Sequence, residues 1–123
     1  MGSEALIEML FHMSTNVKLY HWQTKSYARH KATDNLLLAV QPLIDTFIET
    51  YIGRYGRPNF NGSFSIEIEE LDDNTSNQLV KYYIQFMKNE VPKYLQGSDT
   101  DLLNIRDSIL GELNKTLYLF TLS

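Results

Sequence analysis

Apolar residues recur every three to four positions in four separate stretches of this chain, which is the spacing of one face of an α-helix. The first stretch predicts a helix over residues 3–25. Its buried stripe comprises Leu6, Leu10, Met13, Val17, Tyr20 and Thr24. A second, longer pattern starts near Tyr27 and ends in the run 53–58, where two glycines and a proline stop the helix. Pro42 inside it predicts a kink, because the periodicity continues on both sides.

The second half of the chain begins with a long connection and then returns to helical spacing. Residues 57–73 predict an irregular crossover, part of which is extended because apolar and polar residues alternate there as in a short strand. The alternating apolar residues are Phe64, Ile66 and Ile68. A third helix is expected over 75–95, with a bend at Pro92, and a fourth from the stop at 97–99 to the end. The candidate caps of the third helix are Asn74, Thr75 and Ser76.

The order of the connections predicts the fold. Two short connections make two helical hairpins, and one long crossover joins the second helix to the third. This arrangement is typical of an all-α, ferritin-like four-helix bundle. With 123 residues, of which 43% are hydrophobic, residues 1–123 are expected to form a single domain with its own core.

Composition removes several classes of function. The chain has no cysteine, which excludes disulfides, thiolate metal sites and thiol nucleophiles. Its net charge of −4, without a dense Lys/Arg cluster, gives electrostatic binding to nucleic acid little to start from, so DNA is a weak candidate partner. No uninterrupted apolar run approaches the roughly 20 residues of a membrane span, and no signal pattern is present, so no membrane association and a cytoplasmic location are expected.

The second predicted helix carries two apolar faces. With His30 set at 0° on a helical wheel, one face lies near about 290° and is ordinary core packing. It contains Leu37, Val40, Ile44, Phe47 and Tyr51. The other face carries His30, Asp34, Asp45 and Glu49 between about 0° and 100°. Leu38, Ile48 and Ile52 are interleaved with them. A small bundle has only one core, so the second face is expected to meet a second subunit.

The four polar residues of this face are potential metal ligands. Asp34 and Asp45 are separated by roughly 16 Å along the helix, too far to bind one metal ion from a single chain. If two such helices cross antiparallel about a two-fold axis, His30 and Asp34 of one chain face Asp45 and Glu49 of the other. His21, just before the turn, is a further imidazole for this site. A mixed nitrogen and carboxylate set with open positions suits Fe(II).

Residues 16–58 resemble the Dps-type mini-ferritins. The resemblance rests on His21-Trp22, His30-x-x-x-Asp34, Asp45-x-x-x-Glu49 and the Gly-rich stop that ends in Pro58. It implies a homodimer through the second helix that assembles into a dodecameric cage. It also implies ferrous iron at the dimer interface, oxidised by peroxide or oxygen without an organic cofactor and stored as ferric mineral. The implied ligands are His21, His30 and Asp34 of one subunit with Asp45 and Glu49 of its mate, and Trp22 lies beside the iron.

Less specific interpretations exist for the same residues. A His-x-x-x-Asp pair alone is most often a surface interaction within one helix. The chain could therefore be a noncatalytic ferritin-like assembly or scaffold protein, with a vestigial metal site and with residues 57–73 free for partner contacts. His12 is expected to form a surface pair with Glu8 rather than to bind metal. The tyrosines are expected to pack in the core and at its rim, and the acidic run 67–73 to be a solvated loop.

Overall fold

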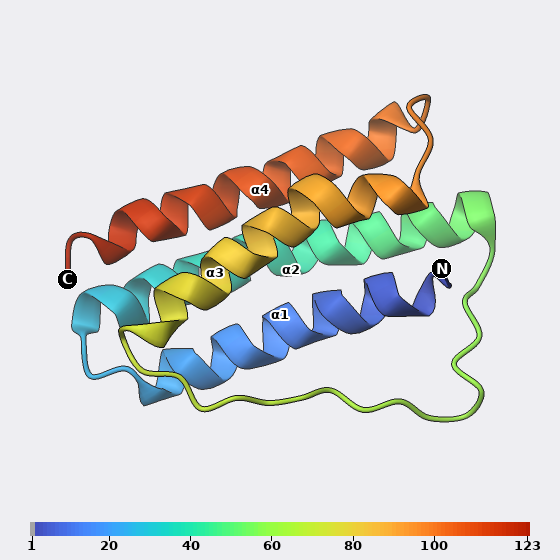
Figure 1. Ribbon diagram of the computed structural model, residues 1–123. Coiled ribbons are helices and arrows are strands. Elements are labelled where there is room, and N and C mark those ends of the chain that lie inside the picture. Colours follow the sequence, from blue (N-terminus) through green and yellow to red (C-terminus); the bar gives the residue numbers. More distant parts are fainter. Residues whose placement is uncertain (1) are drawn as a thin grey trace.

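The computed structural model describes residues 2–123, and these residues form four long helices and no β-strand (Figure 1). The helices are α1 (Glu4–Gln23), α2 (Tyr27–Tyr55), α3 (Thr75–Gln85) and α4 (Thr100–Phe120). A π-helical turn η1 (Phe86–Glu90) and a 3-10 turn η2 (Val91–Tyr94) extend α3. The all-α class predicted from the sequence is therefore confirmed.

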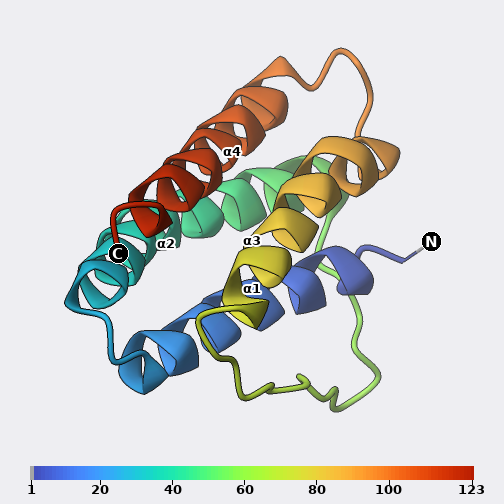
Figure 2. The ribbon, with the colours of Figure 1, turned by 60° about the vertical axis from the view of Figure 1, so that its left-hand side comes forward.

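The four helices lie side by side around one core. Figures 1 and 2 show α1 running antiparallel to α2, α3 antiparallel to α4, and the crossover 56–74 returning along the length of the molecule. All four helices contribute to one cluster of buried apolar side chains. Examples are Leu10, Phe47, Tyr83 and Leu113. The first helix ends at Gln23, two residues earlier than predicted, because Thr24 adopts an extended conformation.

The crossover is extended but pairs with no strand among the described residues. Asn16 of α1, which is fully buried, holds it in place. Its Nδ2 donates to the Glu67 carbonyl oxygen at 2.9 Å, and its Oδ1 accepts from the Glu69 backbone N–H at 2.7 Å. One amide side chain thus satisfies the donor and acceptor that a neighbouring strand would otherwise use. The predicted long crossover between the second and third helices is confirmed, but the strand-like alternation within it forms no β-strand among the described residues.

The start and end of α3 differ from the sequence prediction. Its first turn is capped by the Asp72 carboxylate, which accepts from the backbone N–H of Asn74 at 2.9 Å and of Thr75 at 2.8 Å. The prediction that a side chain of residues 74–76 supplies the cap was wrong, because the unpaired N–H groups donate to the Asp72 carboxylate instead. At the other end, Pro92 has no N–H and its ring conflicts with the Lys88 carbonyl, so the helix widens into the π-helical turn.

His12 does not form the predicted surface pair with Glu8. Its Nδ1 lies 2.8 Å from the Tyr83 hydroxyl, which joins α1 to α3. The Tyr83 ring is almost fully buried, and burial raises the pKa of its phenol. The helical wheel of α1 shows that His12 lies opposite its first buried stripe, but it cannot show that α3 covers that side.

A buried arginine joins α1, α2, α3 and the end of the chain. Arg29 is 8% exposed, and its Nη1 donates to Tyr20, Ser76 and Asn77 at 3.0–3.1 Å. Its Nε donates to the Ser123 hydroxyl at 3.1 Å. The guanidinium also lies 4.4 Å from the centre of the Phe120 ring, as in a cation–π contact. This network fixes the first turn of α2 within the bundle.

A second cluster ties the end of α2 to the start of α4. Arg54 donates to Asp99 at 2.8 Å and makes a two-pronged contact with Asp101 at 2.8 and 3.0 Å. Asp99 is buried and also accepts from the Tyr55 hydroxyl and the Gln96 backbone N–H. The Gln96 N–H, the Tyr55 hydroxyl and Arg54 hold the pKa of the Asp99 carboxyl below its usual value.

Asp99→Asn is expected to lower the urea midpoint of unfolding at pH 7 and to have much less effect at pH 3. A carboxyl with a depressed folded-state pKa stabilises the fold above its unfolded pKa, and this stabilisation is lost as the pH falls through the folded value. The wild type should therefore lose more stability than the variant below about pH 4. Equal pH dependence of the two proteins would contradict this role. Asp107→Asn, at an exposed position of α4, is the matched control.

By length and composition α2 also qualifies as a membrane-crossing helix, a finding that the sequence prediction did not include. Core helices of soluble proteins share these properties. Here one face of α2 packs against α1 and α4, with Leu36, Val40 and Phe47 buried. Its opposite face carries four of the five predicted ligands, namely His30, Asp34, Asp45 and Glu49.

Candidate metal site on the outer face of α2

The turn between α1 and α2 brings His21 and His30 together. Ser26 begins α2 by accepting a hydrogen bond from the Arg29 backbone N–H at 3.2 Å, so that the two helices meet within three residues. The two imidazole rings are stacked, with centres 3.9 Å apart and planes inclined by 19°. His21 is buried, whereas His30 is half-buried. The sequence prediction that these histidines are neighbours is matched by this geometry.

The backbone determines which imidazole nitrogens are free. Nδ1 of His21 donates to the His30 carbonyl oxygen at 2.9 Å, and Nδ1 of His30 donates to the His21 carbonyl oxygen at 3.0 Å. A carbonyl oxygen only accepts, so the proton of each neutral ring must lie on Nδ1. Each Nε2 therefore keeps an unshared electron pair. This is the state in which an imidazole binds a metal ion.

Thr33 fixes the His21 ring further. Its hydroxyl donates to the Arg29 carbonyl oxygen at 2.8 Å and so can accept from Nδ1 of His21, 3.0 Å away. Burial lowers the pKa of His21, and the nearby His30 lowers it further, while Asp34 acts in the opposite direction. His21 therefore favours the neutral form that a metal ion requires.

The carboxylates lie on the same outer face in two groups. Asp34 is half-buried one turn after His30 and is near enough for its charge to act on His21. Asp45 and Glu49 are exposed and adjacent, and Asp45 raises the pKa of the Glu49 carboxyl by sharing a hydrogen bond with it and by its negative charge. Two carboxyl groups so close together favour a shared proton or a shared cation.

One chain does not bring the two groups together. Within residues 2–123 there is no cluster of three or more side chains of the metal-binding types. The rise of α2 separates Asp34 from Asp45 by roughly 16 Å. The structure thus pairs His21 with His30, near Asp34, and pairs Asp45 with Glu49. The five predicted ligands remain two half-sites in the single chain.

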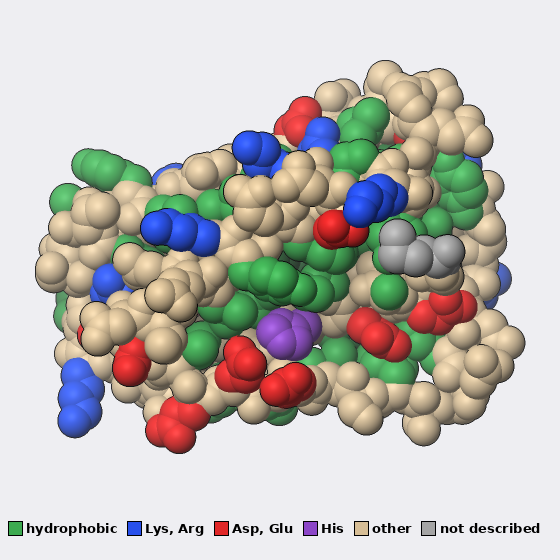
Figure 3. Space-filling model, in the orientation of Figure 1, with side chains coloured by type: hydrophobic (Ala, Val, Ile, Leu, Met, Phe, Trp, Pro, Cys, Tyr) green, Lys and Arg blue, Asp and Glu red, His purple; other side chains and the backbone are tan. Residues whose placement is uncertain are grey.

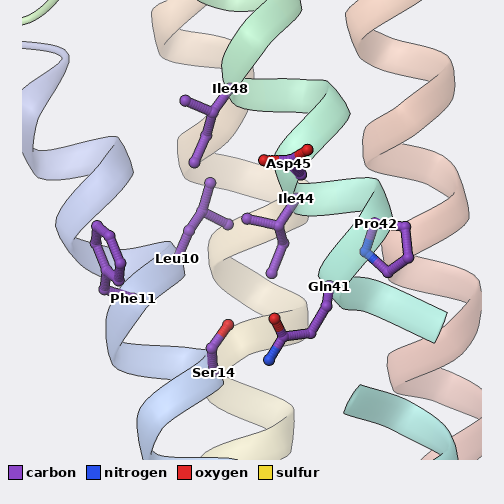
Figure 4. Close-up of a pocket in the computed structure, with 8 residues that line it drawn as sticks. All are labelled: Leu10, Phe11, Ser14, Gln41, Pro42, Ile44, Asp45 and Ile48. Atoms are coloured by element: carbon purple, nitrogen blue, oxygen red, sulfur yellow. The ribbon is translucent and has the colours of Figure 1, made fainter. Parts of the chain in front are cut away.

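A groove of about 600 Å³ lies beside Asp45, between α1 and α2 (Figure 4). Its apolar lining comes from both helices and includes Phe11 and Ile48. Figure 4 shows Gln41 directed toward Ser14 of α1. The outer face of α2 is therefore hollowed next to one of the half-sites.

Trp22 lies at the surface, 68% exposed, with the ammonium group of Lys18 5.4 Å from its ring centre. Within the described chain it stacks on neither histidine. Tyr27 stacks loosely on His30 instead, with the ring centres 6.5 Å apart. Sequence reasoning missed Tyr27 and Thr33. Thr33 could have been found from the sequence, because it falls near about 300° on the helical wheel of α2, within the core face. A polar side chain there needs a buried hydrogen-bond partner.

Comparisons with known proteins place the chain in a family without giving it an activity. A stretch of 37 residues is 54% identical to the "Uncharacterized 14.6 kDa protein in mobD-ri intergenic region" of Enterobacteria phage T4. The match covers 30% of this chain and only 29% of the phage protein. No solved structure matches the chain. The model of the "Family of unknown function (DUF5856)" matches residues 21–120, which are most of the chain, and the protein therefore belongs to that family.

Proposed function

We propose that this protein is a ferritin-like bundle that binds ferrous iron between two copies of the chain and oxidises it. The observation that carries the proposal is the hydrogen bonding of His21 and His30, which leaves both Nε2 atoms free near Asp34. Metal-binding histidines commonly donate their other ring N–H to a backbone carbonyl in this way. The all-α fold with a long crossover supports the ferritin-like assignment.

The carboxylate pair supplies the other half of the proposed site. A divalent cation between Asp45 and Glu49 would relieve the repulsion that raises the pKa of Glu49. Oxygen ligands from one chain and imidazole nitrogens from the other form a set that suits Fe(II). Each Fe(II) gives up one electron, so two ferrous ions reduce one peroxide, which takes up two protons and leaves as two waters. No organic cofactor is needed.

The proposed partner is a second copy bound through α2, and the proposed final assembly is a dodecameric cage in the cytoplasm. The charge distribution supports a second copy of the chain, rather than nucleic acid, as the partner. Figure 3 shows acidic side chains gathered along the crossover and α1, a part of the surface that would repel phosphates, whereas the Lys and Arg side chains of this view lie scattered, mostly in its upper part.

The test is anaerobic addition of Fe(II), followed by peroxide, with ferric absorbance and light scattering recorded together. Asp45→Asn is expected to slow oxidation by more than about tenfold without changing helix content, because Asp45 is exposed and lies away from the core. Glu70→Gln removes the same charge from the exposed crossover and should leave the rate unchanged. A wild-type rate in Asp45→Asn would overturn the proposal.

A noncatalytic assembly protein is the second candidate, and the stacking of the histidines favours it. With the rings stacked 3.9 Å apart, an ion in the plane of one imidazole lies outside the plane of the other. Iron binding by both therefore requires one ring to turn, and His30 is the more exposed of the two. A protein that self-associates but neither binds nor oxidises iron would be this assembly protein with a vestigial site.

A further inference from the structure

The crossover passes along the outer side of α1 as a single extended segment. Residues 63–72 contain no turn or bend, and Figures 1 and 2 show no other element beyond them. Apolar and polar side chains alternate over 64–69, which is the pattern of a β-strand with a different environment on each face. The segment therefore has the shape of a strand, although it pairs with no strand among residues 2–123.

Asn16 of α1 occupies one edge of this segment. Its fully buried amide bonds the carbonyl oxygen of Glu67 and the N–H of Glu69, which are two residues apart. In an extended chain the N–H and C=O of one residue point to one edge, and those of the next residue point to the opposite edge. The backbone groups of residues 67 and 69 therefore face α1. Those of Ile66 and Ile68 face away from it.

The side chains agree with this orientation. Ile68 lines a shallow groove together with Trp22 of α1 and Gln41 of α2. The neighbouring Glu69 lies toward α3, where its negative charge adds to the effect of burial in raising the pKa of the Tyr83 phenol. With α1 on one side of the segment and side chains directed to two others, the free backbone groups point away from the protein.

The outer edge of the segment is unpaired. Within residues 2–123 no hydrogen bond uses the backbone N–H or C=O of Ile66 or Ile68. A row of such groups on an extended chain is a template for pairing with another extended chain. Asn16 already holds the segment in the conformation that pairing requires, so binding would order little additional backbone of this protein. The outer edge thus has the geometry that β-strand addition uses.

Charge selects the kind of chain that can pair with this edge. Glu67 and Glu69 are exposed on one face of the segment, and Ile66 and Ile68 lie on the other. Side chains that are opposite each other on paired strands share a face, and like charges there are destabilising. A second copy of the crossover would bring glutamates beside glutamates. A peptide with basic residues on the first face and apolar residues on the second is complementary to both faces.

We infer that residues 64–69 bind an extended peptide of alternating basic and apolar residues, which adds to their outer edge as an antiparallel strand. Antiparallel pairing is chosen because it is slightly more stable per residue than parallel pairing. The apolar residues of the peptide then lie opposite Ile66 and Ile68 and exchange hydrogen bonds with them, and its basic residues lie beside Glu67 and Glu69. The inference is independent of iron binding and is tested on the metal-free protein.

Amide hydrogen exchange, followed by NMR, tests which edge the peptide uses. The probe is a seven-residue peptide of alternating lysine and valine with both ends blocked. At saturation it should slow exchange at the N–H groups of Ile66 and Ile68 at least about tenfold, because these groups become hydrogen-bonded. The N–H of Glu67 faces α1 and should exchange as before. Unchanged exchange at Ile66 and Ile68 with millimolar peptide would overturn the inference.

Methylation of the peptide backbone tests the direction of pairing. In the antiparallel arrangement the valine N–H groups donate to the protein, whereas the lysine N–H groups point to solvent. N-methylation of the valines should therefore raise the dissociation constant at least about tenfold. N-methylation of the lysines, the matched control, should raise it less than about threefold. Equal losses from the two patterns would contradict antiparallel addition.

Variants of the protein test the same hydrogen bond from the other side. Ile68→Pro removes the outward N–H but keeps an extended backbone, and it leaves the contacts of Asn16 with Glu67 and Glu69 in place. The affinity for the lysine–valine peptide should fall at least about tenfold. Ile68→Thr keeps the N–H and a β-branched side chain, so the affinity should fall less than about threefold. Circular dichroism checks that both variants fold. Wild-type affinity in Ile68→Pro would overturn the inference.

Exchanging charges tests the choice of partner. The double variant Glu67→Lys, Glu69→Lys should lose the lysine–valine peptide and bind one of alternating glutamate and valine instead. A variant that still prefers the lysine peptide would contradict the role of charge. Self-association of the wild type that Ile68→Pro abolishes, without any binding of the peptide, would assign the edge to a second copy and overturn the inference.

Discussion

Arg29→Ala is expected to destabilise the protein by about 3 kcal/mol, which is among the largest effects of any single substitution in this chain. Four hydrogen bonds from the guanidinium would be lost, and their acceptors on Tyr20, Ser76, Asn77 and Ser123 would lose their donor. The contact with the Phe120 ring would go as well. Chemical denaturation followed by circular dichroism measures the change.

The size of this effect follows from the burial of the network. A polar group left unsatisfied away from water destabilises a fold by about 1–3 kcal/mol, and hydrogen bonds to charged groups lie at the upper end. No carboxylate pairs directly with Arg29 among the described ion pairs. Asp73 is linked to it only indirectly, because its carboxylate accepts from the Tyr20 hydroxyl at 2.5 Å. The arginine is thus held mainly by neutral acceptors.

Two further variants show whether the hydrogen-bonding geometry matters. Arg29→Lys keeps the charge but supplies fewer donors in a different arrangement, so its stability should lie between those of the wild type and Arg29→Ala. Arg57→Ala, on the exposed crossover, should change stability by less than about 0.5 kcal/mol. If Arg29→Ala proved as stable as Arg57→Ala, the hydrogen-bond network of Arg29 would contribute nothing measurable to the free energy of unfolding.

Arg29 also connects stability to the candidate site. Its backbone carbonyl accepts from the Thr33 hydroxyl, and Thr33 in turn orients His21. The residue after Arg29 is His30, whose carbonyl accepts from His21. A loosened first turn of α2 would therefore disturb the paired imidazoles before the rest of the bundle unfolds.

The helices were predictable because each buries one regular stripe. The bounds of α1 and α2 agree with the prediction to within two or three residues, since Thr24 and the run 53–58 end the helical spacing locally. The wheel also placed the outer face of α2 correctly, with Asp45 and Glu49 exposed and Phe47 buried.

What could not be predicted depends on contacts between elements. A wheel shows which side of α1 carries His12 but not that Tyr83 will cover it. The buried position of Arg29 had a signal, because the residue falls near about 260° on the wheel, at the edge of the core face. Arginine is usually exposed, and the partners that make its burial acceptable come from α3 and the last residue of the chain.

A mixture of two inactive variants is expected to recover about one quarter of the wild-type rate of iron oxidation. Asp34→Asn and Asp45→Asn each damage both shared sites in their own homodimers. When subunits exchange freely at equal amounts, half of the dimers are mixed. Each mixed dimer carries both damaged residues in one site and leaves the other site intact. Peroxide-dependent ferric absorbance measures recovery, and native mass spectrometry confirms the mixed dimers.

The matched control mixes Asp45→Asn with Glu49→Gln. Both residues belong to the same half-site, so every site in every dimer retains one defect and no activity should return. Recovery in the first mixture alone requires Asp34 and Asp45 of different chains to act together, because roughly 16 Å separates them within one helix. Failure of the first mixture, with mixed dimers present, would mean that iron does not bind across the outer faces of two α2 helices.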